Sequence, residues 1–517
     1  MPSIIVLSVA GIAAAYVFLR ALASLTHDPR EPKQIIGKIP FISPLIGMLY
    51  EKGRYYIRMR DEHGLPIYTL RVPGPPLYVV NSLSMIQRID RHISTVAFSP
   101  IQARACDKAM AVSKDGMDKI AGEKKLTEDG YLRSFPRASA PAVSPGRGLD
   151  ALNREAVSKF AATFDRLAAQ GCATVKLFAW VQHEIFAATT HAMYGPHNPF
   201  RHGGNEKAWF EYEAGILTML MDFMPSIFAR RSLQARDVMV AEFERYFQES
   251  RHEDGSLFVQ LRQKHNLAFG LSISDTAHTE VGQVAAGIIN TAPTAFWAAW
   301  QILADPVVYE DCRSEVAQLV QTDPDGVCTI DLAQVRTACP ILVSTWQEVL
   351  RFHGISIAAR IIQEDTLVDN KYFLKKGGVV LMPNAVIHSD QSLWGPTAGE
   401  FNHKRFLKAK KDGSTRHPAA AFRGFGGGHV LCPGRHFAST EILSLLALLL
   451  VRFDVRPVGG KWVEPGKNMV MDRACPLPKD DVEVELTPKS DQKWRIIFSD
   501  SDQGINIVAE DLDDGES

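Results

Sequence analysis

The most informative stretch of this sequence is Phe425-Gly426-Gly427-Gly428-His429-Val430-Leu431-Cys432-Pro433-Gly434-Arg435. Its consecutive glycines allow positive φ angles and a backbone that passes very close to a flat ligand. Pro433 and Gly434 then turn the chain into an apolar helical run from Phe437 to Val451. Cys432 is therefore predicted to lie just before a helix N-terminus, where backbone N–H groups favour the thiolate.

Three roles are open to a cysteine in this position. A thiolate is a good axial ligand for haem iron, because it pushes electron density towards O–O cleavage. A buried free thiol beside a glycine-rich turn is the commonest fate of a lone Cys. A catalytic nucleophile would need an adjacent base such as His429 or His436. The glycine run before Cys432 favours the haem interpretation.

The same stretch resembles the signature of the cytochrome P-450 superfamily of haem-thiolate monooxygenases, F-x-x-G-x-R-x-C-x-G. Val430 stands where that signature usually has Arg, so one common propionate partner is missing. The resemblance implies the cytochrome P-450 fold, mainly α with small β-sheets (α+β), and haem b as cofactor. Four residues match the signature, namely Phe425, Gly428, Cys432 and Gly434. Cys432 would be the axial iron ligand, and the other implied cofactor-binding residues of the loop are Phe425, Gly426, His429 and Arg435.

A charged motif lies upstream. Glu348-Val349-Leu350-Arg351 falls in a stretch of helical period, where a spacing of three places both charges on one face. In the resembled family this E-x-x-R motif pairs with an Arg from F-x-P-x-R-F, and Phe401 to Phe406 fits with His403 in place of Pro. The resemblance implies a buried structural charge network that supports the cysteine loop and needs every partner. Its members would be Glu348, Arg351 and Arg405.

Two further positions concern the haem propionates. Arg360 stands where the family places an Arg on a propionate, and a guanidinium can bind a carboxylate bidentately. The alternative is an ordinary exposed Arg. The family's W-x-x-x-R motif is not visible, although Arg133 and Arg137 lie near its usual place.

Val281 to Leu303 is a long apolar run that predicts a helix, and Pro293 predicts a kink because it removes a helical N–H. Within the run, Ala286 to Thr291 is similar to the family pattern A/G-G-x-D/E-T-T/S, which relays protons to bound oxygen. Ile289 replaces the acid and Asn290 the alcohol, and an amide is not a practical general acid near pH 7. A small residue at 287 would let O2 and substrate approach. The implied catalytic residues are Gly287, Asn290 and Thr291.

The run also contains an Asn-Thr-x-Pro-x-x-Phe-Trp pattern, formed by Asn290, Thr291, Pro293, Phe296 and Trp297. This pattern looks like that of a subgroup containing sterol 7α- and 12α-hydroxylases and prostacyclin synthase. Some of that subgroup hydroxylate bulky alicyclic substrates with NADPH, whereas prostacyclin synthase rearranges a peroxide without an electron donor. Two uses of Asn290 remain open. It could order a distal water together with Thr291, or it could cap the kink by bonding a freed carbonyl.

The N-terminus carries an apolar run from Ile4 to Leu19, which continues past Arg20 to Leu25. A cleavable signal peptide is the alternative, but no basic residue precedes the run, which is longer than an h-region of about 7–15 residues. We predict a transmembrane signal anchor over residues 1–26 and a Pro-rich hinge over 27–48. Basic residues after the run place the remainder in the cytosol. The predicted location is the endoplasmic reticulum membrane, with a single pass and a cytosolic catalytic domain.

The chain has 517 residues, with 57 Lys and Arg against 58 Asp and Glu, and 46% apolar side chains. This globular, near-neutral composition gives no electrostatic case for binding nucleic acid. Seven scattered Cys without a CxxC pair predict no disulfide framework. Without repeats or low-complexity linkers, residues 49–490 are predicted to form one haem-thiolate catalytic domain. The expected elements include helices over 152–167 and 208–223 and short strands over 67–72, 77–80 and 378–382.

The C-terminal residues 491–517 are predicted to be an acidic tail. From Ser499 onward the chain has seven acidic residues and no Lys or Arg. A segment of this composition cannot bury much apolar surface, so we expect it to be solvated.

The sequence thus predicts a membrane-anchored haem-thiolate monooxygenase that inserts one atom of O2 into a bulky hydrophobic substrate such as a sterol, terpenoid or other secondary metabolite. Electrons would come from NADPH through a separate NADPH-cytochrome P-450 reductase, because the chain has no GxGxxG fingerprint in a βαβ setting. The first alternative is a reductase-independent haem-thiolate isomerase or dehydratase that acts on a peroxide. The others are a non-catalytic haem sensor or carrier and a non-haem enzyme with Cys432 as nucleophile.

Overall fold

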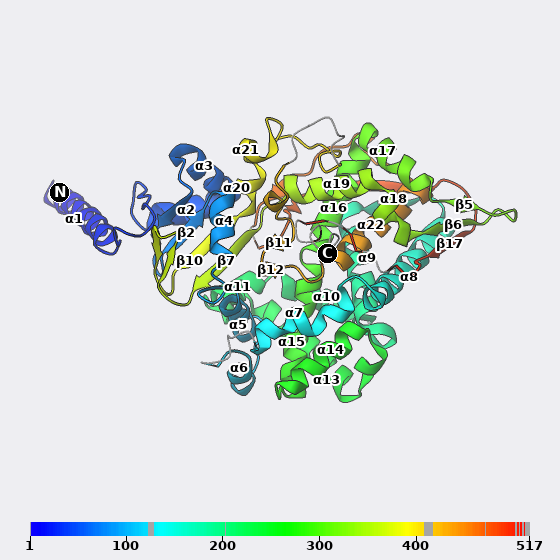
Figure 1. Cartoon of the computed structure of the whole chain (residues 1–517), viewed down its shortest axis with the longest axis horizontal. Helices are drawn as coiled ribbons and strands as arrows, with labels where there is room; N and C mark the ends of the chain where they lie inside the picture. Colours follow the sequence, from blue (N-terminus) through cyan, green and yellow to red (C-terminus); the bar gives the residue numbers. More distant parts are fainter. Residues whose placement is uncertain are drawn as a thin grey trace.

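The computed structural model describes residues 2–122, 129–201, 203–407, 417–470, 472–501, 504, 505, 507, 508 and 511. A sheet-rich part and a larger helical body lie side by side, and helix α1 (Pro2–Leu25) projects away from both (Figure 1). The predicted mainly α fold with small β-sheets is confirmed.

The largest sheet has the strand order β1-β2-β10-β7-β3. Its first two strands form an antiparallel hairpin, β10 joins β2 in parallel, and β7 pairs antiparallel with both β10 and β3. All three strand segments predicted from the sequence lie in this sheet. Its strands are β1 (Ile67–Leu70), β2 (Leu77–Val80), β3 (Val96–Ala97), β7 (Ile357–Ile362) and β10 (Val379–Pro383).

The remaining strands form smaller sheets. Their bounds are β4 (Ala173–Lys176), β13 (Phe453–Pro457) and β16 (Glu483–Pro488); β5 (Gln321–Thr322), β6 (Cys328–Asp331) and β17 (Trp494–Ile497); β8 (Thr366–Val368) and β9 (Tyr372–Leu374); β11 (Gly426–Gly427) and β12 (Val430–Leu431); and β14 (Lys467–Asn468) and β15 (Leu477–Pro478).

Several helices border the large sheet, and the others build the helical body (Figure 1). The first group is α2 (Ile42–Tyr50), α3 (Gly53–His63), α4 (Leu83–Ile89), α20 (Asn384–His388) and α21 (Gln391–Trp394). The second is α5 (Ser99–Lys108), α6 (Lys114–Ala121), α7 (Tyr131–Val143), α8 (Arg147–Gln170), α9 (Leu177–Tyr194), α10 (Gly203–Glu213), α11 (Ile216–Met221), α12 (Pro225–Phe228), α13 (Arg230–Gln248), α14 (Leu257–Ala268), α15 (Ile273–Ile288), α16 (Thr291–Ala304), α17 (Pro306–Ala317), α18 (Val335–Ala338), α19 (Pro340–Phe352) and α22 (Arg435–Arg452).

The helix predicted over 281–303 is present, and it is interrupted between α15 and α16 at residues 289–290. Pro293 cannot donate to the carbonyl of Ile289, which lies four residues earlier, so the ladder fails at this point. Two threonine hydroxyls donate hydrogen bonds to carbonyls next to this break. Thr291 donates to Gly287 at 2.8 Å and Thr294 donates to Asn290 at 2.7 Å. The predicted kink is confirmed.

Two other expectations are wrong. The continuous helix over 208–223 is broken at Gly215, where a Cβ would lie 2.2 Å from the hydroxyl of Ser232. The C-terminal segment is not fully solvated, because Ile505, Ile507 and Val508 are at most 3% exposed. These apolar side chains stand among the acidic residues and provide the buried surface that the composition seemed to lack. Most of the acidic residues of this segment lie outside the described part.

Helix α22 runs through the core of the helical body, and most of its side chains are buried. It packs against α8, α16, α17 and α19. The residue before its first turn therefore has a fixed place relative to both α16 and α19, which carry the other predicted motifs.

Candidate functional site

The cysteine loop is a tight hairpin. Strands β11 and β12 pair antiparallel, and the exposed residues Gly428 and His429 form the turn between them. The N–H of Cys432 donates to the carbonyl of Phe425 at 3.0 Å. Gly426 has a φ of 88°, and a Cβ there would lie 2.6 Å from the carbonyl oxygen of Val430, so glycine is required. The hairpin presents Cys432 directly before α22, whose N-cap is Gly434.

The Cys432 thiol is free. Burial raises the pKa of Cys432, while the N–H of Gly434 and the charge of Arg435 act in the opposite direction. The start of the helix thus favours the thiolate, as the sequence indicated. Desolvation nevertheless has the larger effect on the pKa of Cys432 when no metal ion is bound. A bound metal ion would reverse this balance, because a thiol that coordinates a metal loses its proton.

The donor set around Cys432 fits haem. Among the described residues, no group of three His, Cys, Asp or Glu side chains could hold a metal ion. A single thiolate holds iron when a macrocycle supplies the equatorial ligands. The glycine hairpin offers a backbone that a flat macrocycle can approach closely, and the buried arginines described next lack full anionic partners.

Arg360 lies in β7 and is 5% exposed, so the alternative of an ordinary exposed Arg is wrong. Its Nη1 donates to the carbonyl of the adjacent Ala359 at 2.8 Å, and the guanidinium lies 5.5 Å from the ring centroid of Phe98. Burial lowers the pKa of Arg360 to about 10, Asp90 opposes this change, and Arg423 adds to it. Arg360 is therefore a buried cation that has no hydrogen bond to a carboxylate of the residues that the structure describes.

Arg423 is a residue that the sequence reasoning missed. It is 4% exposed, its Nη2 is 3.5 Å from Oδ2 of Asp90, and its Nε has no hydrogen-bond partner among the described residues. Its main chain is fixed on both sides, because its N–H donates to Nε2 of His388 and its carbonyl accepts from the amide of Asn384. The only signal in the sequence is a basic residue at the start of the glycine loop.

Arg435 and Arg137 do not join the site. The Arg435 guanidinium donates to Oδ1 of Asp511 at 2.9 and 2.6 Å and to the Cys432 carbonyl at 3.3 Å. It is therefore turned towards the C-terminal segment rather than offered to a cofactor. The Arg137 side chain is 76% exposed and faces Asp129. Phe425 packs near Trp346, with 6.4 Å between ring centroids.

The oxygen-side helix has an open face. Ala286 in α15 and Asn290 at the helix break lie about one turn apart and are exposed, although α16 is largely buried. A Cβ at Gly287 would point towards α9, 3.7 Å from Cγ2 of Thr189. A distance of 3.7 Å is an ordinary van der Waals contact, so Gly287 faces α9 and not an open space. The open space lies at the neighbouring residue, Ala286, which is exposed. The Thr291 hydroxyl is directed to the Gly287 carbonyl.

Asn290 makes a contact that neither sequence interpretation foresaw. Its Oδ1 accepts a hydrogen bond from the N–H of Ala474 at 2.8 Å. Capping a freed helix carbonyl would need the Nδ2 group as donor, so the observed bond is a different one. Ala474 also accepts from the N–H of Ile355, and Trp297 donates to the carbonyl of Pro476 at 2.7 Å. The turn at 472–476 is thus fastened to the helix break.

The same turn carries a buried ion pair. Nη1 of Arg473 is 2.6 Å from Oε1 of Glu213 at the end of α10, and both side chains are at most 10% exposed. Burial raises the pKa of Glu213, and Arg473 opposes this change. Asn290 and Glu213 therefore hold the turn from two different helices.

Glu441 lies inside α22 and is 2% exposed. Its Oε1 accepts a hydrogen bond from the hydroxyl of Thr189, and its Oε2 has no partner. Burial raises the pKa of Glu441 to about 8. This carboxyl is therefore protonated near neutral pH, next to the side of α15 that bears Gly287.

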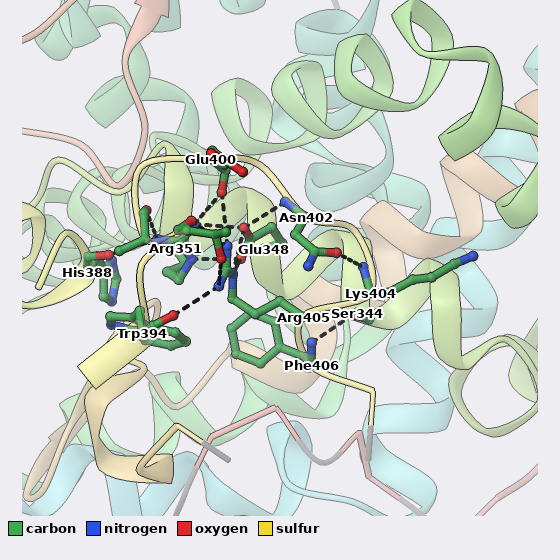
Figure 2. A network of polar contacts seen from close by, with 12 residues as sticks. Ser344, Glu348, Arg351, His388, Trp394, Glu400, Asn402, Lys404, Arg405 and Phe406 are labelled. Atoms are coloured by element: carbon green, nitrogen blue, oxygen red, sulfur yellow. Dashed lines mark hydrogen bonds and ion pairs between the residues drawn. The ribbon is translucent and has the colours of Figure 1, made fainter. Parts of the chain in front are cut away.

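The structure brings Glu348, Arg351 and Arg405 together, as Figure 2 shows. Arg351 donates to both oxygens of Glu348 at 2.7 Å, and Nε of Arg405 lies 3.0 and 3.1 Å from the same two oxygens. Glu348 and Arg351 are 0% and 2% exposed. The remaining guanidinium N–H groups donate to the carbonyls of His388, Trp394, Thr397, Ala398 and Glu400. The cluster joins α19 to the segment that leads towards the cysteine loop.

Comparisons with known proteins agree with this geometry. The sequence model of the cytochrome P450 family matches residues 213–477. The chain is 32% identical over 495 residues to the cytochrome P450 monooxygenase nodJ of Hypoxylon pulicicidum, covering 93% of this chain and 95% of that protein. It is 25% identical to a cytochrome P450 monooxygenase of Gibberella zeae (89% and 87% covered) and to cytochrome P450 7B1 of Mus musculus (87% and 90% covered).

A solved structure shows the same fold. The retinoic acid-bound cyanobacterial CYP120A1 superposes with a TM-score of 0.68, covering 89% of this chain and 99% of that one at 19% identity. The fold, the glycine hairpin before Cys432 and the relatives lead to one conclusion. The chain belongs to the cytochrome P450 family and is a monooxygenase of that family.

Proposed function

We propose that this cytochrome P450 is anchored in a membrane and inserts one atom of O2 into a bulky hydrophobic substrate. One observation carries the proposal. A lone cysteine is presented by a glycine hairpin at the start of α22, and α16, which packs against α22, begins at a helix break beside the open face at Ala286 and Asn290. This arrangement combines an iron ligand with an apolar approach to it.

The site residues would have different roles in binding haem and water. Cys432 would hold the iron of haem b as a thiolate, and haem bound in this way supplies O2 activation. The backbone of the glycine hairpin would lie close to the macrocycle, while Arg360 would pair with a propionate. The hydroxyl of Thr291 and the amide of Asn290 would hold water close to the helix break, and the Glu348, Arg351 and Arg405 network would keep the hairpin in place.

Membrane anchoring is supported by exposed apolar side chains. The part of α1 from Val6 to Leu25 is long and apolar enough to cross a membrane and is almost unburied. Apolar side chains in and next to α2, α11 and α12 are also exposed, and α2 and α11 lie towards the α1 side of the molecule (Figure 1). They are Ile39, Ile42, Ile46, Leu49, Leu217, Met221, Phe223, Ile227 and Phe228. Such a surface is suited to contact with lipid.

We propose a single-pass protein of the endoplasmic reticulum membrane with a cytosolic catalytic domain. Its parts would be an anchor over 1–26, a hinge over 27–48, the catalytic domain over 49–490 and the C-terminal segment over 491–517. Electrons would come from NADPH through NADPH-cytochrome P-450 reductase.

The proposed substrate is a sterol, terpenoid or other bulky secondary metabolite. Supporting this class, relatives with high coverage are fungal monooxygenases and the mouse cytochrome P450 7B1. The turn at 472–476, which Asn290 and Glu213 hold in place, and the end of α10 would contact the substrate.

The second candidate is a peroxide isomerase that needs no reductase, and Asn290 is its only support. Because Oδ1 of Asn290 is already bonded to Ala474, only the amide NH2 is left to face a ligand. This occupancy favours the monooxygenase.

Reconstitution separates the two. Full-length protein in lipid vesicles is incubated with candidate substrates under 18O2, with and without NADPH and reductase. One labelled oxygen atom in the product, formed only with NADPH and reductase, is expected. Unlabelled product formed without them would establish the isomerase instead.

A further inference from the structure

Val430 leaves the hairpin without the arginine that the family signature has there. We propose that Arg423 takes this place and, together with Arg360, binds a haem propionate. The inference rests on the proposed haem binding and adds a residue outside the signature to it.

The position of Arg423 supports the exchange. In the hairpin, Gly427 pairs directly with Val430. Side chains of directly opposed residues in an antiparallel pair lie on the same face. A Cβ at Gly427 would lie 2.9 Å from Nη1 of Arg423, so this guanidinium fills the side-chain place of Gly427. It therefore sits next to the place where an arginine at position 430 would start.

The hydrogen bonding of Arg423 is incomplete. Its side chain is about 95% buried, its Nε has no acceptor within the described part of the chain, and Nη2 is only within ion-pair distance of Asp90. A buried donor without a partner is costly, and a buried cation more so. A buried guanidinium held open in this way is suited to a bidentate carboxylate.

The charges around Arg423 do not balance. Two buried guanidinium groups, Arg360 and Arg423, share the single carboxylate of Asp90, and His429 lies close enough to influence Asp90 as well. The Arg423 charge contributes to the lowered pKa of Arg360, which means that the two cations repel each other. One further carboxylate would neutralise the cluster. A haem propionate would provide it.

The competing explanation is that Arg423 is only a structural partner of Asp90. The two explanations differ in their consequences for Asp90→Asn. If Arg423 serves Asp90, then Asp90→Asn and Arg423→Leu break the same pair and act alike. If Arg423 serves a propionate, Asp90→Asn removes a competing carboxylate and leaves haem at least as firmly bound.

The test measures haem loss from the purified haem-loaded protein to an excess of a haem-scavenging apoprotein. We expect Arg423→Leu to lose haem about tenfold faster than the wild type, as for a lost hydrogen bond to a charged group. Arg423→Lys should be intermediate. Because the main-chain bonds of Arg423 to His388 and Asn384 remain, the fold should be kept, which circular dichroism checks.

A rescue variant keeps the test decisive. In Arg423→Leu, the second change Val430→Arg should restore slow haem loss, because it returns a guanidinium to the same face. Three results would each overturn the inference. The Arg423→Leu variant could retain haem like the wild type, Val430→Arg could fail to restore slow haem loss, or Asp90→Asn and Arg423→Leu could have equal effects. If the wild-type protein binds no haem, the proposed function fails, independently of Arg423.

Discussion

The carboxylate of Asp511 accepts two hydrogen bonds from the guanidinium of Arg435, at 2.9 and 2.6 Å. Its other oxygen accepts from the N–H groups of Ile507 and Val508. Arg435 in turn donates to the carbonyl of Cys432. The C-terminal segment is therefore tied, through one arginine, to the residue that we assign as the iron ligand.

Replacing Asp511 by Asn should destabilise the protein. The change leaves the Arg435 charge without its partner in a site where Asp511 is 4% exposed, a loss of about 2 kcal/mol. A fall of the thermal midpoint of the haem-loaded protein checks this. Asp500→Asn is the matched control. Asp500 lies in the same C-terminal segment as Asp511 and pairs with Arg154, but its side chain is 79% exposed. Equal midpoints for both variants would show that the segment is not docked.

Glu348→Gln should prevent accumulation of haem-loaded protein. It removes the carboxylate that two buried arginines share, and breaking such a cluster costs about 3–5 kcal/mol, a large part of a typical folding free energy. The measurement is the yield of protein that binds CO after reduction. Glu62→Gln, which affects an exposed pair with Arg58, serves as control and should change the yield little. A normal yield for Glu348→Gln would refute the supporting role of the network.

Glu441 should make stability depend on pH. Its pKa is about 8 in the folded protein, against an ordinary value of 4.5. A folded pKa above the unfolded one means that the stabilisation is complete below about pH 4.5 and is lost as the pH rises through about 8. Between these values the slope approaches 1.4 kcal/mol per pH unit.

The check is the difference in thermal midpoint between Glu441→Gln and the wild type across pH 5 to 8.5. The wild-type midpoint should fall relative to the variant as the pH rises, because the variant cannot ionise. Parallel curves would mean that Glu441 is ionised in the folded protein throughout this range.

Asn290→Ala should weaken substrate binding rather than block chemistry outright. It removes the acceptor of the Ala474 N–H and loosens the turn at 472–476, so the spectral dissociation constant should rise about fivefold, as for one hydrogen bond. Asn290→Asp keeps an acceptor and should restore binding. Unchanged binding with lost product formation in Asn290→Ala would place Asn290 at the iron-bound ligand instead.

The motifs around Cys432, Glu348 and Pro293 could be predicted because they depend on local chemistry. A glycine-rich loop before a helix, an i,i+3 charge pair and a proline kink each follow from the residues themselves. The family resemblance then supplied the order in which these parts meet, and the fold followed from it.

The remaining features depend on partners distant in the sequence. Asn290 bonds Ala474, Arg473 pairs with Glu213, and nothing in the spacing of these residues indicates contact. The C-terminal segment was expected to be solvated from its average composition, whereas three apolar side chains and one carboxylate decide its packing. Arg423 was missed because incomplete hydrogen bonding of a buried cation is visible only once burial is known.

The central claim is that Cys432 is a thiolate ligand of haem iron. The most direct measurement is the absorption spectrum of the reduced, CO-bound, full-length protein. We predict a Soret band at the position typical of thiolate ligation, which Cys432→Ser removes while circular dichroism shows an intact fold. Absence of that band from folded, haem-loaded wild-type protein, or its persistence in Cys432→Ser, would contradict the account.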